Sequence, residues 1–345
     1  MNEAILSVVH AGPHVTIQDA GRAGLMRFGV PSSGPMDRAS HLAANVALGN
    51  AADTPGIEVS VGGLTIQCLS GAVTFAMAGG GFIVEHAERK SSSWNIATLR
   101  AGEHLTIRRG PWGSWTYLAL AGRLEARDWL SSASTHGPSG LGGGRLASGQ
   151  HLVVADAVVR EDREGAIPCP ITARPRQEVH VVLGPQDRFF ADDSVAAFLG
   201  VPYRLTNAYD RMGVRLEGPS LKPIASLDMP SEPIVRGSVQ VAGDGVATVL
   251  LADHQTTGGY PKIATVLDAD LDAFVQLRPS DMVAFRAITP EQAIERARMR
   301  TAATGRYLTA VASARGSLAH RLMNENLIGG VVDASRPHED ALSGS

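Results

Sequence analysis

The segment LADHQTTGGYPKIATV, residues 251–266, carries more polar side chains than a tight turn needs. Apolar runs at 246–252 and 263–267 flank it and are typical of strands. Its hydroxyl, amide and ammonium groups suit a site for an amide, a ureido ring or a phosphate, and the alternative is a decorated hairpin turn. The glycine spacing does not fit a phosphate loop, and no Ser or Thr follows the lysine. The polar residues are Asp253, His254, Gln255, Thr256, Thr257, Tyr260 and Lys262.

A second polar cluster, TIQDAGRAGLMRFGVPSSGPMD, spans residues 16–37. A strand is expected to end at Gln18 and Asp19, and the glycines that follow allow backbone turns that other residues resist. Asp37, His41 and Asn45 fall on one helical stripe. Asp37 therefore has two interpretations. It is either a carboxylate that orients a neighbour or accepts a proton, or a helix cap beside a solvated polar face, which the spacing favours.

A third cluster, DRMGVRLEGPSL, spans residues 210–221 and places Arg211 four residues before Arg215. Guanidinium groups bind carboxylates and phosphates through paired hydrogen bonds. A strand with surface ion pairs explains the same spacing equally well.

Other signals are weaker. The glycine-rich segment 140–149 follows no strand–turn–helix pattern, and the eleven histidines form no HExxH motif, so we expect neither a nucleotide loop nor a metal site there.

Short strands bounded by Gly, Pro or Asp must position these clusters. Such segments recur along the chain, and clear examples are 63–69, 114–122 and 281–288. They predict a mainly β fold built of barrels or sandwiches. A charged, proline-rich stretch at 156–178 interrupts the strands and marks a boundary. We therefore expect three regions, which are an N-terminal β domain at 1–165, a C-terminal β domain at 175–288 and a helical, partly disordered tail at 289–345.

Three helices are expected among the strands. The first covers about 35–48 and is stopped by Gly49, and the second covers about 193–199. The third begins after Thr289, where Pro290 suits the first turn and Gln292 completes a capping box. In the tail, 317–326 is expected to be partly helical.

The composition of the 345-residue chain, with 44% hydrophobic and 19% charged residues, is ordinary for a soluble globular protein. A net charge of -3 gives no basic footprint, so a nucleic-acid partner is not expected. No apolar run reaches the roughly 18 residues of a membrane span, and the N-terminal residues lack a secretory signal. Cys68 and Cys169 lie outside any CxxC pattern. We therefore expect reduced thiols and a cytoplasmic location.

Taken together, the three clusters resemble one family. It is called the KipA, allophanate hydrolase subunit 2 or 5-oxoprolinase C-subunit family, and its members are also described as biotin-dependent carboxyltransferases. The resemblance also rests on AANVALGN at 43–50, Glu58, GPQDRFF at 184–190 and GSVQV at 237–241, and it covers about residues 7–286. It implies two cyclophilin-like β-barrel subdomains, followed here by the helical tail.

The resemblance further implies which residues form the site. Asp37, Asp253 and Lys262 would be catalytic. The two carboxylates would serve proton transfer or amide N–H recognition, and the lysine would stabilise developing negative charge. The residues implied to bind substrate or shape the pocket are Gln18, Asp19, Arg22, Ser33, Arg211, Arg215, Gln255, Thr256, Thr257, Gly258, Gly259 and Tyr260.

Three functions follow from the resemblance. The first is participation in an ATP-dependent complex that opens the lactam of 5-oxoproline to glutamate, together with a KipI-type partner (the 5-oxoprolinase B subunit) and a LamB-type partner (the A subunit). The second is the carboxyltransferase component of a biotin-dependent urea or amide carboxylase, which takes carboxybiotin from another polypeptide. The third is a non-catalytic regulator that sequesters a KipI-type kinase inhibitor. ATP would bind through the complex, because the chain has no recognisable nucleotide motif. Departures from the family pattern occur at Ala133, His136 and Arg236.

Overall fold

The computed structural model describes residues 2–224 and 229–313. Strands predominate within them, which confirms the mainly β fold expected from the sequence. The strands of the first half are β1 (Glu3–Ala11), β2 (Thr16–Gln18), β3 (Gly56–Ser60), β4 (Leu64–Ser70), β5 (Ala72–Ala78), β6 (Gly81–His86), β7 (Arg89–Ser92), β8 (Asn95–Arg100), β9 (His104–Trp112), β10 (Trp115–Leu120), β11 (Arg123–Leu124), β12 (His151–Ala155) and β13 (Gly165–Ala166). Those of the second half are β14 (Glu178–Leu183), β15 (Tyr203–Tyr209), β16 (Gly213–Glu217), β17 (Glu232–Pro233), β18 (Ser238–Val241), β19 (Ala247–Leu250), β20 (Thr257–Gly258), β21 (Lys262–Val266) and β22 (Met282–Ala287). The α-helices are α1 (Arg38–Leu48), α2 (Asp192–Gly200), α3 (Asp268–Phe274) and α4 (Pro290–Ala312).

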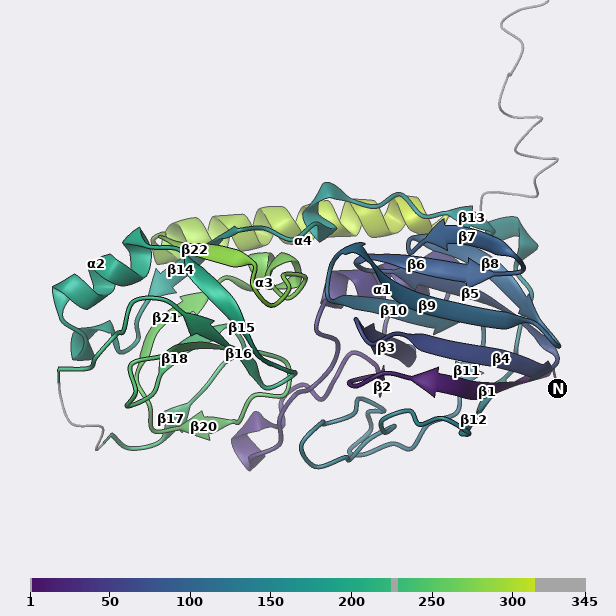
Figure 1. Ribbon diagram of the computed structural model, residues 1–345, viewed down its shortest axis with the longest axis horizontal. Coiled ribbons are helices and arrows are strands. Elements are labelled where there is room, and N and C mark those ends of the chain that lie inside the picture. Colours follow the sequence, from purple (N-terminus) through teal and green to yellow (C-terminus); the bar gives the residue numbers. More distant parts are fainter. Residues whose placement is uncertain (1, 225–228, 314–345) are drawn as a thin grey trace, which may run out of the picture.

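Two sheets make up the first half (Figure 1). Their strand orders are β11-β12-β1-β4-β9-β6-β7 and β13-β8-β5-β10-β3-β2. Side chains of both sheets, such as Leu6 and Phe75, share one core. Strand β10 is buried throughout, because successive side chains point to opposite faces of a sheet and both faces are covered. Leu118 enters the core between the sheets, while Tyr117 and Ala119 enter a second core that includes α1.

The second half contains a closed seven-stranded barrel of order β14-β21-β18-β19-β16-β15-β22. The parallel pair β14 and β22 closes it. Alternate apolar residues of its strands, such as Val181, Val239 and Phe285, are fully buried. No strand of one half pairs with a strand of the other among the described residues. This separation supports the division at 1–165 and 175–288, which we keep as a proposal.

The polar segment 251–266 does not form a hairpin. Strands β19 and β21 are not neighbours, because β18 lies between them and pairs with both. The connection instead passes the end of β18, where Val241 N donates to Pro261 O at 3.0 Å. Within the connection, β20 pairs with β17. The hairpin interpretation is therefore wrong.

The expected capping residues of α1 and α4 are present, but α1 begins later than expected. Helix α1 begins at Arg38 rather than at residue 35, because the Asp37 side chain accepts a hydrogen bond from Ser40 N at 3.0 Å and acts as the N-cap. Helix α4 begins with the predicted capping box of Thr289 and Gln292. Helix α3 is not expected from the sequence.

Helix α4 lies along both halves of the molecule (Figure 1). Arg163 fixes its far end, because Arg163 Nη1 donates to Ala47 O at 3.1 Å and to Ala312 O at 2.8 Å, at the C-terminal ends of α1 and α4. The rest of the expected tail, including 317–326, lies outside the described residues. Among the residues that are described, no helix has the length and apolar character needed to cross a membrane.

Candidate functional site

A buried arginine links the two halves. Arg211 lies in the turn between β15 and β16, and its guanidinium faces the Asp253 carboxylate with two hydrogen bonds, Nε to Oδ2 at 2.9 Å and Nη2 to Oδ1 at 3.0 Å. Arg211 Nη1 also donates to Glu58 of β3, and Nη2 donates to Gly34 O at 2.6 Å. The three charged side chains are at most 3% exposed. Arg211 is therefore a buried connection rather than an open clamp for a ligand.

Glu58 extends the hydrogen-bond network from Arg211 to the start of α1. Its Oε2 accepts hydrogen bonds from Tyr117 Oη and from Met36 N, both at 2.8 Å. The Tyr117 hydroxyl oxygen in turn accepts from Asp37 N at 2.7 Å. Because the two carboxylates outweigh the effect of burial, the pKa of Arg211 lies above its ordinary value.

Asp253 stays ionised although it is buried, because its charged and hydrogen-bonding partners compensate for the loss of water. Burial acts to raise its pKa, but the Arg211 charge and hydrogen bonds outweigh burial and hold the pKa of Asp253 below its ordinary value. Gly137 N donates to Asp253 Oδ2 at 2.9 Å. A Cβ at residue 137 would lie 3.2 Å from the same oxygen, so glycine permits this close approach. Ser33 is buried, and its Oγ has no hydrogen-bond partner among the described residues.

The N-terminal residues Gln18, Asp19 and Arg22 organise the loop that leads to Gly137. Asp19 accepts hydrogen bonds from both hydroxyls of Ser132 and Ser134 at 2.6 Å. Burial opposes these bonds, yet the pKa of Asp19 remains lowered. Arg22 Nε donates to Trp129 O at 2.8 Å, while its buried Nη1 has no hydrogen-bond partner among the described residues. Gln18 Nε2 donates to Thr135 O at 3.1 Å. These three residues are thus positioned to shape the wall beside Asp253.

Lys262 is a buried cation whose ammonium group lacks a hydrogen-bond partner among the described residues. Its side chain is 3% exposed, and its Nζ has no hydrogen-bond partner within the described ranges. The nearest acidic oxygen, Glu232 Oε2, lies 3.8 Å from Nζ. Gln186 holds both residues, because Lys262 N donates to Gln186 Oε1 at 2.9 Å and Gln186 Nε2 donates to Glu232 Oε2. An ammonium that is buried but not hydrogen-bonded suits an oxygen supplied by a ligand.

Amide side chains adjoin Lys262. Gln255 Nε2 donates to Gln240 Oε1 at 3.3 Å, and Gln240 Nε2 donates to Tyr260 O at 3.4 Å. A Cβ at Gly258 would lie 3.0 Å from Gln240 Nε2, so this glycine leaves room for the amide. The Tyr260 side chain is 46% exposed. Of the remaining residues, the Thr256 carbonyl accepts from Ile234 N just after β17, Thr257 is exposed and Gly259 lies between β20 and β21.

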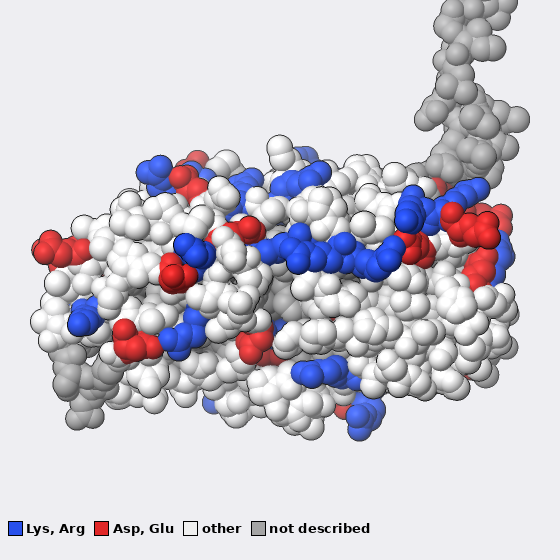
Figure 2. Space-filling model, in the orientation of Figure 1, with Lys and Arg blue, Asp and Glu red and all other residues white. Residues whose placement is uncertain are grey.

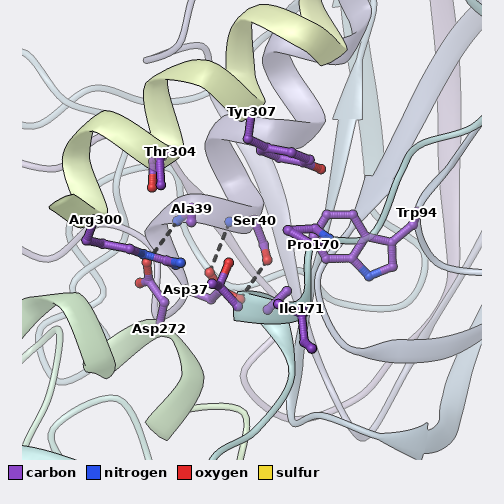
Figure 3. A pocket seen from close by; sticks show the side chains of 13 residues that line it. Asp37, Ala39, Ser40, Trp94, Pro170, Ile171, Asp272, Arg300, Thr304 and Tyr307 are labelled. Atoms are coloured by element: carbon purple, nitrogen blue, oxygen red, sulfur yellow. Dashed lines mark hydrogen bonds between the residues drawn. The ribbon is translucent and has the colours of Figure 1, made fainter.

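Asp37 lies at a cavity of about 200 Å³ between α1, α3 and α4 (Figure 3). Its carboxylate accepts from Ser40 Oγ at 2.6 Å and from Gln276 Nε2 at 2.8 Å. Asp272 accepts from the first backbone N–H groups of α1, including Arg38 N at 2.9 Å. Burial, and then the charge of Asp272, raise the pKa of Asp37 to about 7. Asp37 is thus a carboxyl group able to give or take a proton near neutral pH.

A family model described as "Carboxyltransferase domain, subdomain A and B" matches residues 28–287 of this chain. The chain belongs to this carboxyltransferase family.

Relatives of this carboxyltransferase domain fall into two groups. The C subunit of 5-oxoprolinase from Haemophilus influenzae is 34% identical over 84% of this chain and 93% of its own length. The protein of the same name from Escherichia coli is 31% identical over 84% of this chain and 94% of its own length. The urea amidolyase of Lachancea kluyveri is 27% identical over 82% of this chain, but only 17% of its own length is covered.

Two solved structures share the fold of this chain. TTHA0988 shares 32% identity with the carboxyltransferase domain at a TM-score of 0.73, over 82% of this chain and 55% of its own. The chain thus spans about half of that protein. The Kluyveromyces lactis urea amidolyase has the same fold, with 22% identity and a TM-score of 0.78 over 89% of this chain and 20% of its own.

One candidate residue lies away from the others in this carboxyltransferase domain. Arg215 is on β16 with its side chain 47% exposed, and its Nη2 contacts Asp244 Oδ2 at 2.6 Å. The surface ion-pair interpretation is therefore correct for Arg215, while Arg211, four residues earlier, is buried. The polar stripe on α1 is not solvated either, since His41 and Asn45 are buried. Within the described ranges, no three potential metal-binding side chains come together.

Several residues of the network are not among the expected site residues. Glu58 itself carries the family resemblance, and Gln186 and Gln240 occur in segments that carry it, so those positions hold the signal that could have named them. Asp272 and Gln276 lie in or just after α3, which is itself unexpected, and no sequence signal points to them. The residues absent from the expected site are thus the ones that connect its parts.

The contribution of Asp37 to the stability of this carboxyltransferase domain should fall as pH rises from about 4 to 7, whereas buried His41, whose pKa is lowered to about 4, acts in the opposite direction. The folded state holds the Asp37 proton up to a pKa of about 7, whereas the unfolded chain releases it near 3.8. Between these values the folded state binds more protons, so the free energy of unfolding decreases with pH. Asn at this position keeps the helix cap. Urea unfolding should therefore show that the stability of wild type relative to Asp37→Asn decreases across this pH range, and parallel pH profiles would contradict it.

Proposed function

We infer that the protein is the C-type component of an ATP-dependent 5-oxoprolinase complex, which hydrolyses the lactam of 5-oxoproline to glutamate. It would act with the KipI-type and LamB-type components of that complex. The observation that carries this proposal is the similarity to two proteins named as the C subunit of 5-oxoprolinase, each covered over 93% or more of its length. The covered share of the urea amidolyase is far smaller.

Lys262 is the residue best suited to act on the lactam carbonyl. Opening an amide places negative charge on its oxygen, and a preorganised cation stabilises that charge most strongly where water is excluded. The Lys262 ammonium is buried and has an unfilled hydrogen-bonding position among the described residues, which supports this role. Gln240 and Gln255 would orient the ring through their amide groups. ATP would phosphorylate the carbonyl oxygen, and water would then add to the activated carbon. Cleavage of the ring C–N bond would give an acyl phosphate, which a second water would hydrolyse to glutamate and phosphate.

Asp253 and Asp37 would have different tasks. Asp253 stays ionised beside Arg211, so it would accept an N–H group or hold the loop at Gly137 rather than donate a proton. Asp37, with a pKa of about 7, would exchange a proton near neutral pH. Arg211 is saturated by protein acceptors, so it would act as a positioning residue for Asp253 and Glu58.

Carboxyl transfer is the second candidate function, and the family description and the urea amidolyase relatives favour it. The ureido carbonyl of biotin and the carbonyl of urea both offer an oxygen that suits the Lys262 ammonium. Carboxybiotin, carried on another polypeptide, would supply the carboxyl group. The same residues would then hold an amide-like acceptor next to it.

The test is to co-purify the chain with its KipI-type and LamB-type partners and to supply each set of substrates in turn. Lactam hydrolysis predicts phosphate release that depends on 5-oxoproline. Carboxylation of urea when carboxybiotin is supplied, without any response to 5-oxoproline, would replace the first function with the second.

A further inference from the structure

A carboxylate from the two-stranded ribbon of β17 and β20 lies beside the Lys262 ammonium. Glu232 is on β17 opposite Gly258 of β20, and these two strands form a sheet of their own outside the barrel. Glu232 Oε2 lies 3.8 Å from Lys262 Nζ, which is too far for a hydrogen bond. The Lys262 side chain is 3% exposed, whereas that of Glu232 is 42% exposed. The ribbon thus places an accessible acceptor next to a buried donor.

This pair differs from the ordinary ion pairs of the surface. Figure 2 shows acidic side chains scattered over one face of the molecule, most of them beside a basic side chain. Arg204 and Glu217 form an exposed pair of this kind. Such pairs contribute little to stability because both groups remain solvated. In the pair of Lys262 and Glu232 only the carboxylate reaches solvent, so the ammonium has lost water without gaining a hydrogen bond from the described residues.

Gln186 fixes Glu232 relative to the barrel. Its Oε1 accepts from Lys262 N at 2.9 Å, and its Nε2 donates to Glu232 Oε2. Gln186 is itself buried, so this bridge is shielded from water. The Glu232 carboxylate is thus held from the inner side, and because the side chain is partly exposed it remains open to a further donor.

Amide groups lie next to the same pair. Gln240 is the register partner of Lys262 between β18 and β21. A Cβ at Gly258, opposite Glu232 in the ribbon, would lie 3.0 Å from Gln240 Nε2 and 3.5 Å from Gln255 Nε2. Glycine therefore lets the ribbon pack closely on both amides, which keeps its carboxylate beside the lysine.

Amides differ in the edge that they offer to such a pair. In a lactam or a ureido ring the C=O and N–H groups lie cis across the C–N bond, so an acceptor and a donor stand side by side. In a trans amide the two groups point in opposite directions. Lys262 Nζ and Glu232 Oε2, 3.8 Å apart, are a donor and an acceptor that two slightly diverging hydrogen bonds from one cis edge reach together. The pair therefore fits a cis amide and not a trans amide.

We propose that Glu232 is a specificity-determining residue, which accepts the N–H group of a cis amide while Lys262 donates to its carbonyl oxygen. The inference rests on the proposed role of Lys262, but it holds for a lactam and for a ureido ring alike. Asp253 is less suited to this task because Arg211 engages both of its oxygens. An N-alkylated ring would leave the Glu232 carboxylate without its donor, so the site selects against it.

The experiment is calorimetric titration of the full-length chain, alone and in complex with its KipI-type partner, in the absence of ATP. One ligand pair is 5-oxoproline and N-methyl-5-oxoproline, and the other is the cyclic urea 2-imidazolidinone and its N,N′-dimethyl derivative. The test variant is Glu232→Met, which keeps the length of the side chain and removes the acceptor. The matched control is Glu217→Met, because Glu217 Oε2 also lies 3.8 Å from a cation, Arg204 Nη1, but on the exposed surface.

Within each pair that binds, wild type should prefer the N–H ligand by at least about tenfold, the effect of one charge-assisted hydrogen bond. Glu232→Met should bring the two affinities close together, and Glu217→Met should keep the wild-type ratio. A purely structural role for Glu232 would weaken both ligands equally and leave the ratio unchanged, which would overturn the proposal. Equal binding of both members by wild type, or no binding of any ligand, would overturn it as well.

The ligand pairs separate this inference from the proposed hydrolysis. Discrimination within the cyclic urea pair, without binding of 5-oxoproline, would support the role of Glu232 and contradict the lactam as substrate. Turnover of 5-oxoproline together with equal binding of its N-methyl derivative would support the hydrolysis and overturn the role of Glu232.

Discussion

Replacing Arg211 with methionine should lower the free energy of unfolding by about 3–5 kcal/mol. The substitution leaves the Glu58 and Asp253 carboxylates buried, with exposures of 0%, and without their shared cation. Removing one partner from a buried ionic group costs more than the group contributes when intact, because the remaining charges lose solvation and gain nothing in return. The two halves also lose their central connection. Urea unfolding followed by intrinsic fluorescence measures the change.

The matched control for this variant is Arg215→Met. Arg215 is the same residue type in the next strand, but it is exposed and pairs with an exposed Asp244, so its loss should cost less than about 1 kcal/mol. Where Arg211→Met alone fails to fold, combining it with Glu58→Gln and Asp253→Asn should restore much of the stability, since no buried charge then remains unpaired. Equal unfolding midpoints for the Arg211 and Arg215 variants would contradict this account of the buried connection.

Replacing Lys262 with methionine should lower the turnover of the reconstituted complex by about 100- to 1,000-fold, the usual effect of removing one group that stabilises an oxyanion. The methionine side chain is similar in length and lacks the charge. Rates of glutamate formation at saturating 5-oxoproline measure the effect. Lys222→Met is the control, because Lys222 is exposed and lies outside the candidate site, and it should retain the wild-type rate.

Although Lys262→Met should lose activity, its free energy of unfolding should not decrease. This difference separates a functional role for Lys262 from a structural one. Its ammonium is buried and has no hydrogen-bond partner among the described residues, so it is an energetic cost to the folded chain. Lys262→Met should therefore be at least as stable as wild type in urea. Full activity together with a large loss of stability would assign Lys262 to the fold and remove it from the site.

Local chemistry makes much of the fold predictable. The capping box at Thr289 and Gln292 predicts the start of α4, and short β-rich segments bounded by Gly, Pro or Asp predict strands such as β10 and β22. Helix α3 escapes prediction because DADLDAF is only seven residues long and rich in aspartate, so it presents less than two turns of apolar pattern. Its stability comes from packing of Leu271 and Phe274 in the core, which is a tertiary effect.

The order of the strands in the barrel cannot be predicted from the local sequence pattern. The runs at 246–252 and 263–267 are recognisable as strands, yet the placement of β18 between them depends on pairings along the whole barrel. The polar residues of 253–262 are indeed too many for a turn. Their number follows from a connection that passes β18 and carries β20 against β17.

The same holds for the site: the sequence identifies candidate residues but not the contacts between them. Family motifs name Arg211, Asp253 and Lys262, but a motif does not state which side chains touch. Arg211 and Glu58 are 153 positions apart in sequence, and only the fold brings them together. Because the Arg211 guanidinium is engaged with Glu58 and Asp253, we propose that Arg211 positions these carboxylates rather than clamping a ligand. We propose that Lys262 contacts the ligand instead, because its whole ammonium group lacks a hydrogen-bond partner among the described residues, and that distinction rests on partners rather than on residue type.

The most direct test of the proposed function is to measure phosphate and glutamate together in the complex of this chain with its KipI-type and LamB-type partners. We expect both products to appear in a one-to-one ratio only when 5-oxoproline and ATP are present, and to disappear when this chain is omitted. Phosphate release that ignores 5-oxoproline, with no glutamate formed, would contradict the proposal.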